Sequence, residues 1–408
     1  MQDRSSFLTA STTSHSIRHR AGSAARLALL ISLLLLAGSL CAAADLLCGA
    51  APAKAVIDWS QFRFQPCHTG FNPYEFVLSP DTVGSLTLRW SAEITGPVYS
   101  SPAVWGGAVY VGSSYNGYFY AFSAITGAML WQYRTRSSVA APVVANGVVY
   151  VGSQDNNLYA LNARTGALLW TYTTDSYIQS SPTVANGVVY FGSFDQNLYA
   201  LNAGTGALLW KYTTGGPIES SPAVANGVVY FGSYDQNLYA LDASTGALLW
   251  KHTTGNWVYS SPAVASGVVY FGSYDQNLYA LDAGTGGLLW QYMTGAAVES
   301  SPAVANGVVY FGSDDANVYA LDASTGNPLW TSATNGFVQS SSAVANGVVY
   351  VGSYDNNLYA LDAGSGAPLW KFATASLIYS SPAVANGSVY VGSEDGNLYA
   401  FSLPAGEK

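Results

Sequence analysis

The side chains that could do chemistry are few, and their spacing limits the chemistry available. The chain has 408 residues and four histidines, of which His15 and His19 lie in an N-terminal stretch expected to be removed. His252 stands where other copies of a repeat carry Tyr or Phe, and His68 precedes the repeats, so we expect structural roles for both. No nucleophile is paired with a base, and no His/Cys cluster has metal-ligand spacing. We therefore predict no catalytic residue and no metal site.

One aspartate recurs about every forty residues and is the acidic pattern most suited to binding cations. It lies in the turn between the second and third predicted strands of each repeat, at Asp155, Asp195, Asp235, Asp275, Asp315, Asp355 and Asp395. Asp in such turns normally accepts hydrogen bonds from nearby backbone amides. We expect this structural role, and a ring of weak calcium sites is the alternative.

A loop before each Ser-Ser-Pro motif is where the copies differ most. The residue directly before Ser-Ser is variable, and some copies carry an aromatic residue two positions earlier. Loops on a rigid scaffold concentrate binding function, and aromatic residues among acids and amides are typical of recognition surfaces. We predict that these residues form a binding rim at one mouth of a central channel, namely Tyr99, Tyr177, Gln179, Glu219, Trp257, Tyr259, Glu299, Phe337, Gln339 and Tyr379. Neutral drift of exposed loops is the alternative.

The element that must position these residues is a repeat. Residues 221–250 return nearly unchanged at 261–290 and 301–330, and a period near forty indicates a propeller or a solenoid. Each complete copy contains four short runs of four to eight strand-forming residues, separated by turn signals such as Asn-Gly and Thr-Gly. The repeat therefore predicts antiparallel meanders of four strands.

Eight copies are present, and the ends of the chain indicate how they close. A Trp marks the fourth strand of each unit, at Trp90, Trp131, Trp170, Trp210, Trp250, Trp290, Trp330 and Trp370. The last unit stops at Phe401 without a fourth strand, whereas residues 86–90 (Leu86–Trp90) form a fourth strand with no unit before it. We predict an all-β, eight-bladed β-propeller of four-stranded antiparallel blades, in which Leu86–Trp90 joins the last blade and leaves no open seam.

The segment between the third and fourth strands carries a family resemblance. Ala240-Leu-Asp-Ala-Ser-Thr-Gly-Ala-Leu-Leu-Trp250 resembles the tryptophan-docking motif of the pyrroloquinoline quinone (PQQ) repeat family, and seven copies occur. Some depart from it, with Asn at 162 and 202, Ser at 365 and Ser at 123. The opening stretch 58–70 also resembles the segment preceding such propellers. The resemblance covers residues 58–402, and it implies that the eight Trp residues join blade to blade.

The family divides by function, so the resemblance alone leaves alternatives open. Some members are PQQ-dependent alcohol or sugar dehydrogenases, and others work without a cofactor, notably the propeller of the bacterial outer-membrane β-barrel assembly machinery. A dehydrogenase implies a catalytic Asp, calcium ligands, a stacking Trp, an Arg and often adjacent cysteines, whereas these blades are near-copies without Cys-Cys. We expect a non-enzymatic scaffold that binds a protein or extended polymer. The alternatives are a dehydrogenase using PQQ and Ca²⁺, and a cell-surface carbohydrate-binding or adhesion module.

The N-terminus predicts export. Arg18, Arg20 and Arg26 precede an apolar run at 27–40 and small residues at 42–44, the pattern of a Sec-type signal peptide. The run is shorter than the roughly 20 residues of a spanning helix. A bulky Leu40 before Cys41 disfavours lipidation. We expect a signal peptide at 1–44, an irregular segment at 45–85 that packs over the first units, and the propeller at 86–408.

Charge and cysteine content restrict partners and compartment. After removal of residues 1–44 the chain keeps 10 basic and 22 acidic residues, a net charge of about −12, which disfavours nucleic acid. Cys48 and Cys67 could pair in an oxidising compartment, and no blade contains Cys. We expect a monomer in the periplasm, on the cell surface or outside the cell, associated with membranes only through its partners.

Overall fold

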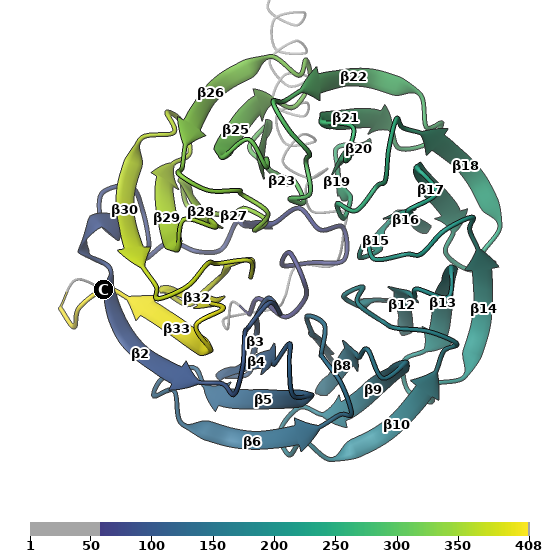
Figure 1. Ribbon diagram of the computed structural model, residues 1–408, viewed down its shortest axis with the longest axis horizontal. Coiled ribbons are helices and arrows are strands. Elements are labelled where there is room, and N and C mark those ends of the chain that lie inside the picture. The colour runs from purple at the N-terminus through teal and green to yellow at the C-terminus, as the bar shows by residue number, and fades with distance from the viewer. Residues whose placement is uncertain (1–57, 407–408) are drawn as a thin grey trace, which may run out of the picture. The chain divides into compact units, whose positions relative to one another are not determined.

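The computed structural model describes residues 58–406, in which eight β-sheets follow one another around a ring (Figure 1). Each sheet is an antiparallel meander of four strands, and one sheet gains a short fifth strand. The eight-bladed propeller is therefore confirmed. The predicted signal peptide, which contains Cys41, and the following Cys48 lie outside the described residues. Between residues 58 and 406 no helix is long and apolar enough to cross a membrane.

Each blade runs from an innermost strand beside the channel to an outermost strand on the perimeter. The innermost strands are β3 (Ala103–Trp105), β7 (Val143–Ala145), β11 (Thr183–Ala185), β15 (Ala223–Ala225), β19 (Ala263–Ala265), β23 (Ala303–Ala305), β27 (Ala343–Ala345) and β31 (Ala383–Ala385). The second strands are β4 (Ala108–Gly112), β8 (Val148–Gly152), β12 (Val188–Gly192), β16 (Val228–Gly232), β20 (Val268–Gly272), β24 (Val308–Gly312), β28 (Val348–Gly352) and β32 (Ser388–Gly392). The third strands are β5 (Tyr118–Ser123), β9 (Asn157–Asn162), β13 (Asn197–Asn202), β17 (Asn237–Asp242), β21 (Asn277–Asp282), β25 (Asn317–Asp322), β29 (Asn357–Asp362) and β33 (Asn397–Ser402). The outermost strands are β6 (Met129–Arg134), β10 (Leu168–Thr173), β14 (Leu208–Thr213), β18 (Leu248–Thr253), β22 (Leu288–Met293), β26 (Pro328–Ala333), β30 (Pro368–Ala373) and β2 (Thr87–Glu93).

The burial of each strand follows its distance from the channel. The second strand β16 reads Val-Val-Tyr-Phe-Gly and is almost wholly buried, because both faces of a middle strand pack against neighbouring blades. A strand covered on both faces is a continuous apolar run instead of an alternating one. The outermost strand β18 is the opposite case, since Leu248 and Leu249 are about half exposed. The core thus lies between blades, and the perimeter is open.

Side chains from the second and fourth strands join each blade to the next. Trp250 donates its indole N–H to the carbonyl of Ala283 in the following blade at 3.0 Å, and Tyr230 donates its hydroxyl to the same carbonyl at 3.1 Å. Gly286 lies under the Trp250 ring at φ +71°, where a Cβ would stand 2.6 Å from the ring. Most of these Trp side chains are only partly buried, so their hydrogen bond is an important part of what they contribute.

The first and last parts of the propeller close the ring. β2 pairs antiparallel with β33 and completes the eighth blade, as predicted. The pairing runs from Thr87 to Glu93, three residues beyond the predicted end at Trp90. Trp370 in the seventh blade donates to the carbonyl of Leu86, directly before β2, at 3.0 Å. The joint between the two ends therefore has the same kind of indole–carbonyl contact as the other blades.

The segment preceding the blades makes wider contacts than we expected. The sequence suggested packing over the first units, but residues 59–72 reach the innermost strand of every blade, and Figure 1 shows this segment inside the ring. Six of its carbonyls accept from the valine N–H of an innermost strand, at Val104, Val144, Val224, Val264, Val304 and Val344. The side-chain oxygen of Gln61 accepts from the backbone N–H of Val184, and the side-chain amide of Asn72 donates to the carbonyl of Val384. β1 (Phe71–Asn72) pairs parallel with β27.

Arg63 and His68 hold this segment together from inside. Both are buried, and both have positive φ. Arg63 donates to the carbonyls of Pro302 at 2.6 Å and His68 at 3.2 Å, and burial lowers the pKa of its guanidinium to about 9. His68 shares a hydrogen bond with Thr183 at 2.9 Å, and burial, with Arg63 nearby, lowers the pKa of its imidazole to about 3. His68 is therefore a neutral structural residue. The adjacent Cys67 is disulfide-bonded.

Candidate functional site

A cavity of about 440 Å³ occupies the channel and is lined by residues of all eight blades. Phe62, from the N-terminal segment, also lines it. That segment bonds to Val104 and its equivalents in the innermost strands. Val104 lies three residues after the cavity-lining Ser101 and closer to the turn that ends the innermost strand, so the segment crosses the channel near the Asn-Gly turns. The cavity therefore faces the opposite side, where each loop arrives from the preceding blade. We call this side, formed by these loops and by the Gly-Ser-X-Asp turns, the variable face.

The structure divides the predicted rim into two groups. Seven of its residues line the cavity, one each from seven blades, namely Tyr99, Gln179, Glu219, Tyr259, Glu299, Gln339 and Tyr379. The other three do not line it, and Tyr177, Trp257 and Phe337 are 50%, 43% and 49% exposed. Each of these three contacts a ring from a Gly-Ser-X-Asp turn, and Trp257 stacks on Tyr234 at 4.9 Å between ring centroids. Ligand binding by either group stays a prediction.

A buried aliphatic residue aims each loop at the channel. Val258 precedes Tyr259 and is fully buried against Gly232. A Cβ on Gly232 would lie 2.4 Å from the Val258 carbonyl, so this close approach requires glycine. Because Val258 is held from behind, Tyr259 turns towards the cavity.

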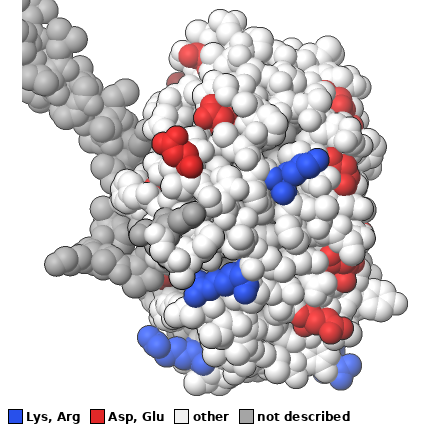
Figure 2. All heavy atoms as spheres, turned by 90° about the vertical axis from the view of Figure 1, so that its left-hand side faces the viewer, with Lys and Arg blue, Asp and Glu red and all other residues white. Residues whose placement is uncertain are grey.

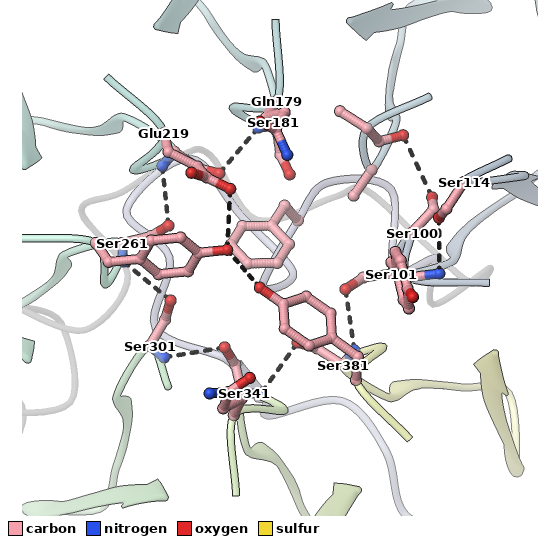
Figure 3. Close-up of a pocket in the computed structure, with 18 of the residues that line it drawn as sticks. Ser100, Ser101, Ser114, Gln179, Ser181, Glu219, Ser261, Ser301, Ser341 and Ser381 are labelled. Atoms are coloured by element: carbon pink, nitrogen blue, oxygen red, sulfur yellow. Dashed lines mark hydrogen bonds between the residues drawn. The ribbon is translucent and has the colours of Figure 1, made fainter. Parts of the chain in front are cut away.

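The cavity wall below the rim is a ladder of serines (Figure 3). The backbone N–H of Ser221 donates to the hydroxyl of Ser261 at 2.9 Å, and the same bond recurs from Ser181 round to Ser101. A deeper set links the hydroxyl of Ser220 to the carbonyl of Ser260 at 3.0 Å. These bonds hold neighbouring innermost strands at a fixed distance, so the cavity has a rigid wall.

The second blade lacks its rim residue. The backbone N–H of Val139 donates to the carbonyl of Ser113, so Val139 is the equivalent of Val258. The next residue, Ala140, accepts from the hydroxyl of Ser100 with its carbonyl, so Ala140 is the equivalent of Ser260. One residue is therefore missing from this loop. The wall there is lined by smaller or more flexible side chains, Ser138 and Gln154, and the rim is asymmetric.

A second ring of variable residues was not predicted from the sequence. Seven of them occupy the X position of the Gly-Ser-X-Asp turns, at Gln154, Phe194, Tyr234, Tyr274, Asp314, Tyr354 and Glu394, and Ser114 occupies the corresponding position in the first blade, where the turn reads Gly-Ser-Ser-Tyr. The turns lie beside the loops, so several of these side chains contact the predicted rim. A signal was present, since X varies in a turn whose other residues are nearly constant.

Glu219 is the centre of one polar cluster in the cavity. It accepts hydrogen bonds from Tyr234 at 2.5 Å and from Tyr259 at 3.0 Å, and Tyr259 also bonds to the hydroxyl of Tyr379. Burial raises the pKa of the Glu219 carboxyl despite these two donors. The cluster crosses the cavity, because Glu219 and Tyr259 precede the innermost strands of the fourth and fifth blades, whereas Tyr379 precedes that of the eighth blade.

Glu299 and Asp314 form a second cluster in which two carboxyls face one another. Burial is the main reason that the pKa of Glu299 rises to about 7, and the charge of Asp314 raises it further, while Tyr274 opposes the rise. Burial also raises the pKa of Asp314. Gln339 donates to Asp314 at 3.4 Å and accepts from the hydroxyl of Tyr354. At neutral pH the pair can share one proton.

The repeated turn aspartates have the structural role that we expected. Asp235 accepts from the hydroxyl of Tyr239 at 2.6 Å and from the backbone N–H groups of Gly215 at 2.8 Å and Asn237 at 3.2 Å. Within residues 58–406, no group of three His, Cys, Asp or Glu side chains is placed to hold a metal ion. His252 lies outside the cavity lining, edge-on to the ring of Tyr279 at 5.8 Å.

Comparisons with known proteins identify relatives of this architecture. A family model described as outer membrane protein assembly factor BamB matches residues 84–143, 135–220, 194–336 and 314–408. The crystal structure of BamB from Moraxella catarrhalis is 21% identical, with a TM-score of 0.69, and the match covers 78% of this chain and 99% of that one. A search among curated proteins found no match.

Enzymes with a similar fold are also found. A europium-containing methanol dehydrogenase is 16% identical with a TM-score of 0.73, covering 86% of this chain and 99% of the enzyme. Quinohemoprotein alcohol dehydrogenase from Comamonas testosteroni is 17% identical with a TM-score of 0.76, covering 89% and 84%. At these identities the similarity concerns the fold alone.

Proposed function

The chain belongs to the family described as outer membrane protein assembly factor BamB, and from that premise we propose that it is an exported, non-enzymatic propeller that binds a polypeptide through its variable face. One observation carries this proposal. The positions that vary most in residue type between blades converge on one mouth of the channel, whereas the Trp, Tyr and Gly of the blade joints and the ladder serines are nearly constant. Variation concentrated in the loops at one side of a rigid ring is the pattern expected of a recognition surface.

The outer aromatic residues supply the contact area. Tyr177, Trp257 and Phe337 are each between 43% and 50% exposed around the mouth, and aromatic anchors dominate the energetics of protein interfaces. One face of the Trp257 indole is already covered by Tyr234, which leaves less of it for stacking on a sugar. On the side of the ring seen in Figure 2, acidic and basic side chains are scattered over a mostly uncharged surface and do not gather into a patch of one sign.

The cavity lining is a poor fit for PQQ, and this supports a function without that cofactor. PQQ is a tricarboxylate anion, and Glu219, Glu299 and Glu394 would meet it with like charges. Among the described residues, no Arg, Lys or Trp lines the cavity to pair with the carboxylates or stack on the ring system. Like charges facing each other in a partly buried site repel strongly. We therefore assign no reaction step to PQQ.

Site-specific photocrosslinking in the source organism tests the proposal. A benzophenone amino acid replaces Tyr177 or Phe337 on the variable face, and Leu249 on the perimeter, 52% exposed, is the matched control. We expect one discrete adduct with an exported polypeptide from positions 177 and 337 and none from 249. Adducts only from 249, or from no position, would refute the proposal.

A parallel measurement addresses the dehydrogenase alternative. The purified chain is titrated with PQQ and Ca²⁺ while absorbance is followed, and dye-linked oxidation of alcohols and sugars is assayed. We expect neither saturable PQQ binding nor turnover. Stoichiometric binding accompanied by turnover would replace the scaffold proposal with an enzymatic one.

A further inference from the structure

In the described part of the chain, carboxyl groups line the cavity without a basic side chain beside them. Glu219, Glu299 and Glu394 line it, whereas no Lys, Arg or His of residues 58–406 does. The buried Arg63 does not line the cavity, but it lines a separate small hollow together with Phe62. Its guanidinium bonds to the carbonyls of Pro302 and His68, not to a carboxylate. Carboxylates withdrawn from water without a positive partner are costly, and such groups are normally paired.

The carboxyl groups also retain unused capacity for hydrogen bonds. Oδ1 of Asp314 is buried and has no hydrogen-bond partner among residues 58–406. Asp314 faces Glu299 directly behind the wall, and the two carboxyls repel unless a proton or another cation lies between them. Asp314 does not line the cavity, but Glu299 does, so a cation beside Glu299 would relieve the repulsion between the two carboxyls in place of a shared proton.

Tyrosine rings complete the surroundings. Tyr99, Tyr259, Tyr354 and Tyr379 line the same cavity, and the rings of Tyr99 and Tyr379 meet edge-on at 5.6 Å. Aromatic rings beside carboxylates favour cations, because the ring faces carry negative electrostatic potential. The ladder serines already bond to one another across the blades, so carboxylate and phenol oxygens are the main acceptors that remain.

We propose that this cavity binds a primary alkylammonium group. Its three N–H donors match the carboxylate and phenol oxygens, and an alkyl chain fits the space above Phe62. The volume, about 440 Å³, is larger than a lysine side chain and so admits one together with water, and the N-terminal segment crosses the channel on the far side. The group can come from a lysine of a polypeptide held on the variable face, which rests on the proposed function, or from a free amine.

Calorimetric titration of the full chain at pH 8 tests the chemistry directly. The probes are n-butylammonium, the capped peptide Gly-Lys-Gly, and capped Gly-norleucine-Gly, which has the same alkyl chain without the charge. We expect one site for both ammonium compounds and binding of the norleucine peptide that is weaker by about tenfold or more, because hydrogen bonds to charged groups contribute this much. Equal binding of all three, or binding of none, would overturn the proposal.

Charge-removing variants locate the site. Glu299→Gln and Glu219→Gln keep side-chain shape and should each weaken ammonium binding about tenfold. Glu93→Gln removes the same charge from an exposed position on β2 and should leave binding unchanged. Equal weakening in all three variants would show a general charge effect and refute the cavity as the site. The comparison of probes on the unsubstituted chain does not depend on how the variants fold.

The experiments distinguish a polypeptide lysine from a free amine, and they test ammonium binding separately from polypeptide binding. Tighter binding of the lysine peptide than of butylammonium assigns the group to a polypeptide, and the reverse order assigns it to a free amine. Crosslinks from the variable face without ammonium binding would overturn this inference alone. Ammonium binding without crosslinks would overturn the proposed function alone.

Discussion

Replacing Glu299 by Gln should stabilise the folded chain above neutral pH and leave its stability unchanged in mild acid. In the folded chain the pKa of Glu299 is raised from 4.5 to about 7, first by burial and then by Asp314 and Glu219, with Tyr274 acting in the opposite direction. Gln keeps an oxygen that can accept from Tyr274, so the substitution removes the charge and little else.

The sign and size of the effect follow from proton binding. Between pH 4.5 and about 7 the folded chain keeps the Glu299 proton that the unfolded chain has lost, so the free energy of unfolding falls as pH rises through this range. At about 1.4 kcal/mol per pKa unit, the full difference corresponds to roughly 3 kcal/mol. Glu299 is only half-buried, so solvent screening reduces the expected gain to about 1–2 kcal/mol at pH 8.

Urea unfolding of both proteins at pH 4.5 and pH 8, followed by tryptophan fluorescence, measures this difference. The two unfolding curves should coincide at pH 4.5 and separate at pH 8, with the variant more stable. Glu93→Gln, at an exposed site, is the control and should match the unsubstituted chain at both values. An equal offset at both pH values, or a less stable variant at pH 8, would refute the electrostatic account of the cavity.

Two further predictions concern what holds the ring together. Gly246→Ala should destabilise the chain by about 2–3 kcal/mol, because φ is +73° and the new Cβ would stand 2.7 Å from the Trp210 ring. Gly227→Ala, at φ +78° with open space around it, should cost only about 1 kcal/mol, and equal losses in thermal unfolding would contradict this steric argument. Arg63→Ala should cost about 3 kcal/mol in urea unfolding, because it leaves the buried carbonyl of Pro302 without its donor, and a change below about 0.5 kcal/mol would show that the N-terminal segment adds little to stability.

Local signals were sufficient to predict the blades. An Asn-Gly turn such as 226–227 needs positive φ at both residues, and both have it, at 50° and 78°. Eight such units end in a blade that lacks one strand, so closure by residues 86–90 could be deduced from counting, and β2 confirms it. These features depend on neighbours in sequence or on the period, both of which a single chain displays.

The positions of the seven rim residues that line the cavity were predictable for the same reason, but their chemistry was not. Tyr259 and its equivalents occupy a fixed position before the innermost strand, so the repeat placed them at the channel. Nothing local indicated that Trp257, two residues earlier, would lie outside the cavity. Likewise, Glu299 and Asp314 lie in a loop and a turn of the same blade, in the positions that Glu219 and Tyr234 occupy two blades earlier, and only the folding of the blade brings the two carboxyls together.

The sequence by itself determined the repeat, the number of blades, the closing strand and the ring of positions that face the channel. Tertiary structure alone decided that the non-repeating residues 59–72 reach all eight innermost strands. It also decided that carboxyl groups from different loops meet in one cavity that no basic side chain of residues 58–406 lines. The physical reason is that periodic patterns record contacts repeated in every blade, whereas a contact made once, between residues distant in the chain, leaves no period to read.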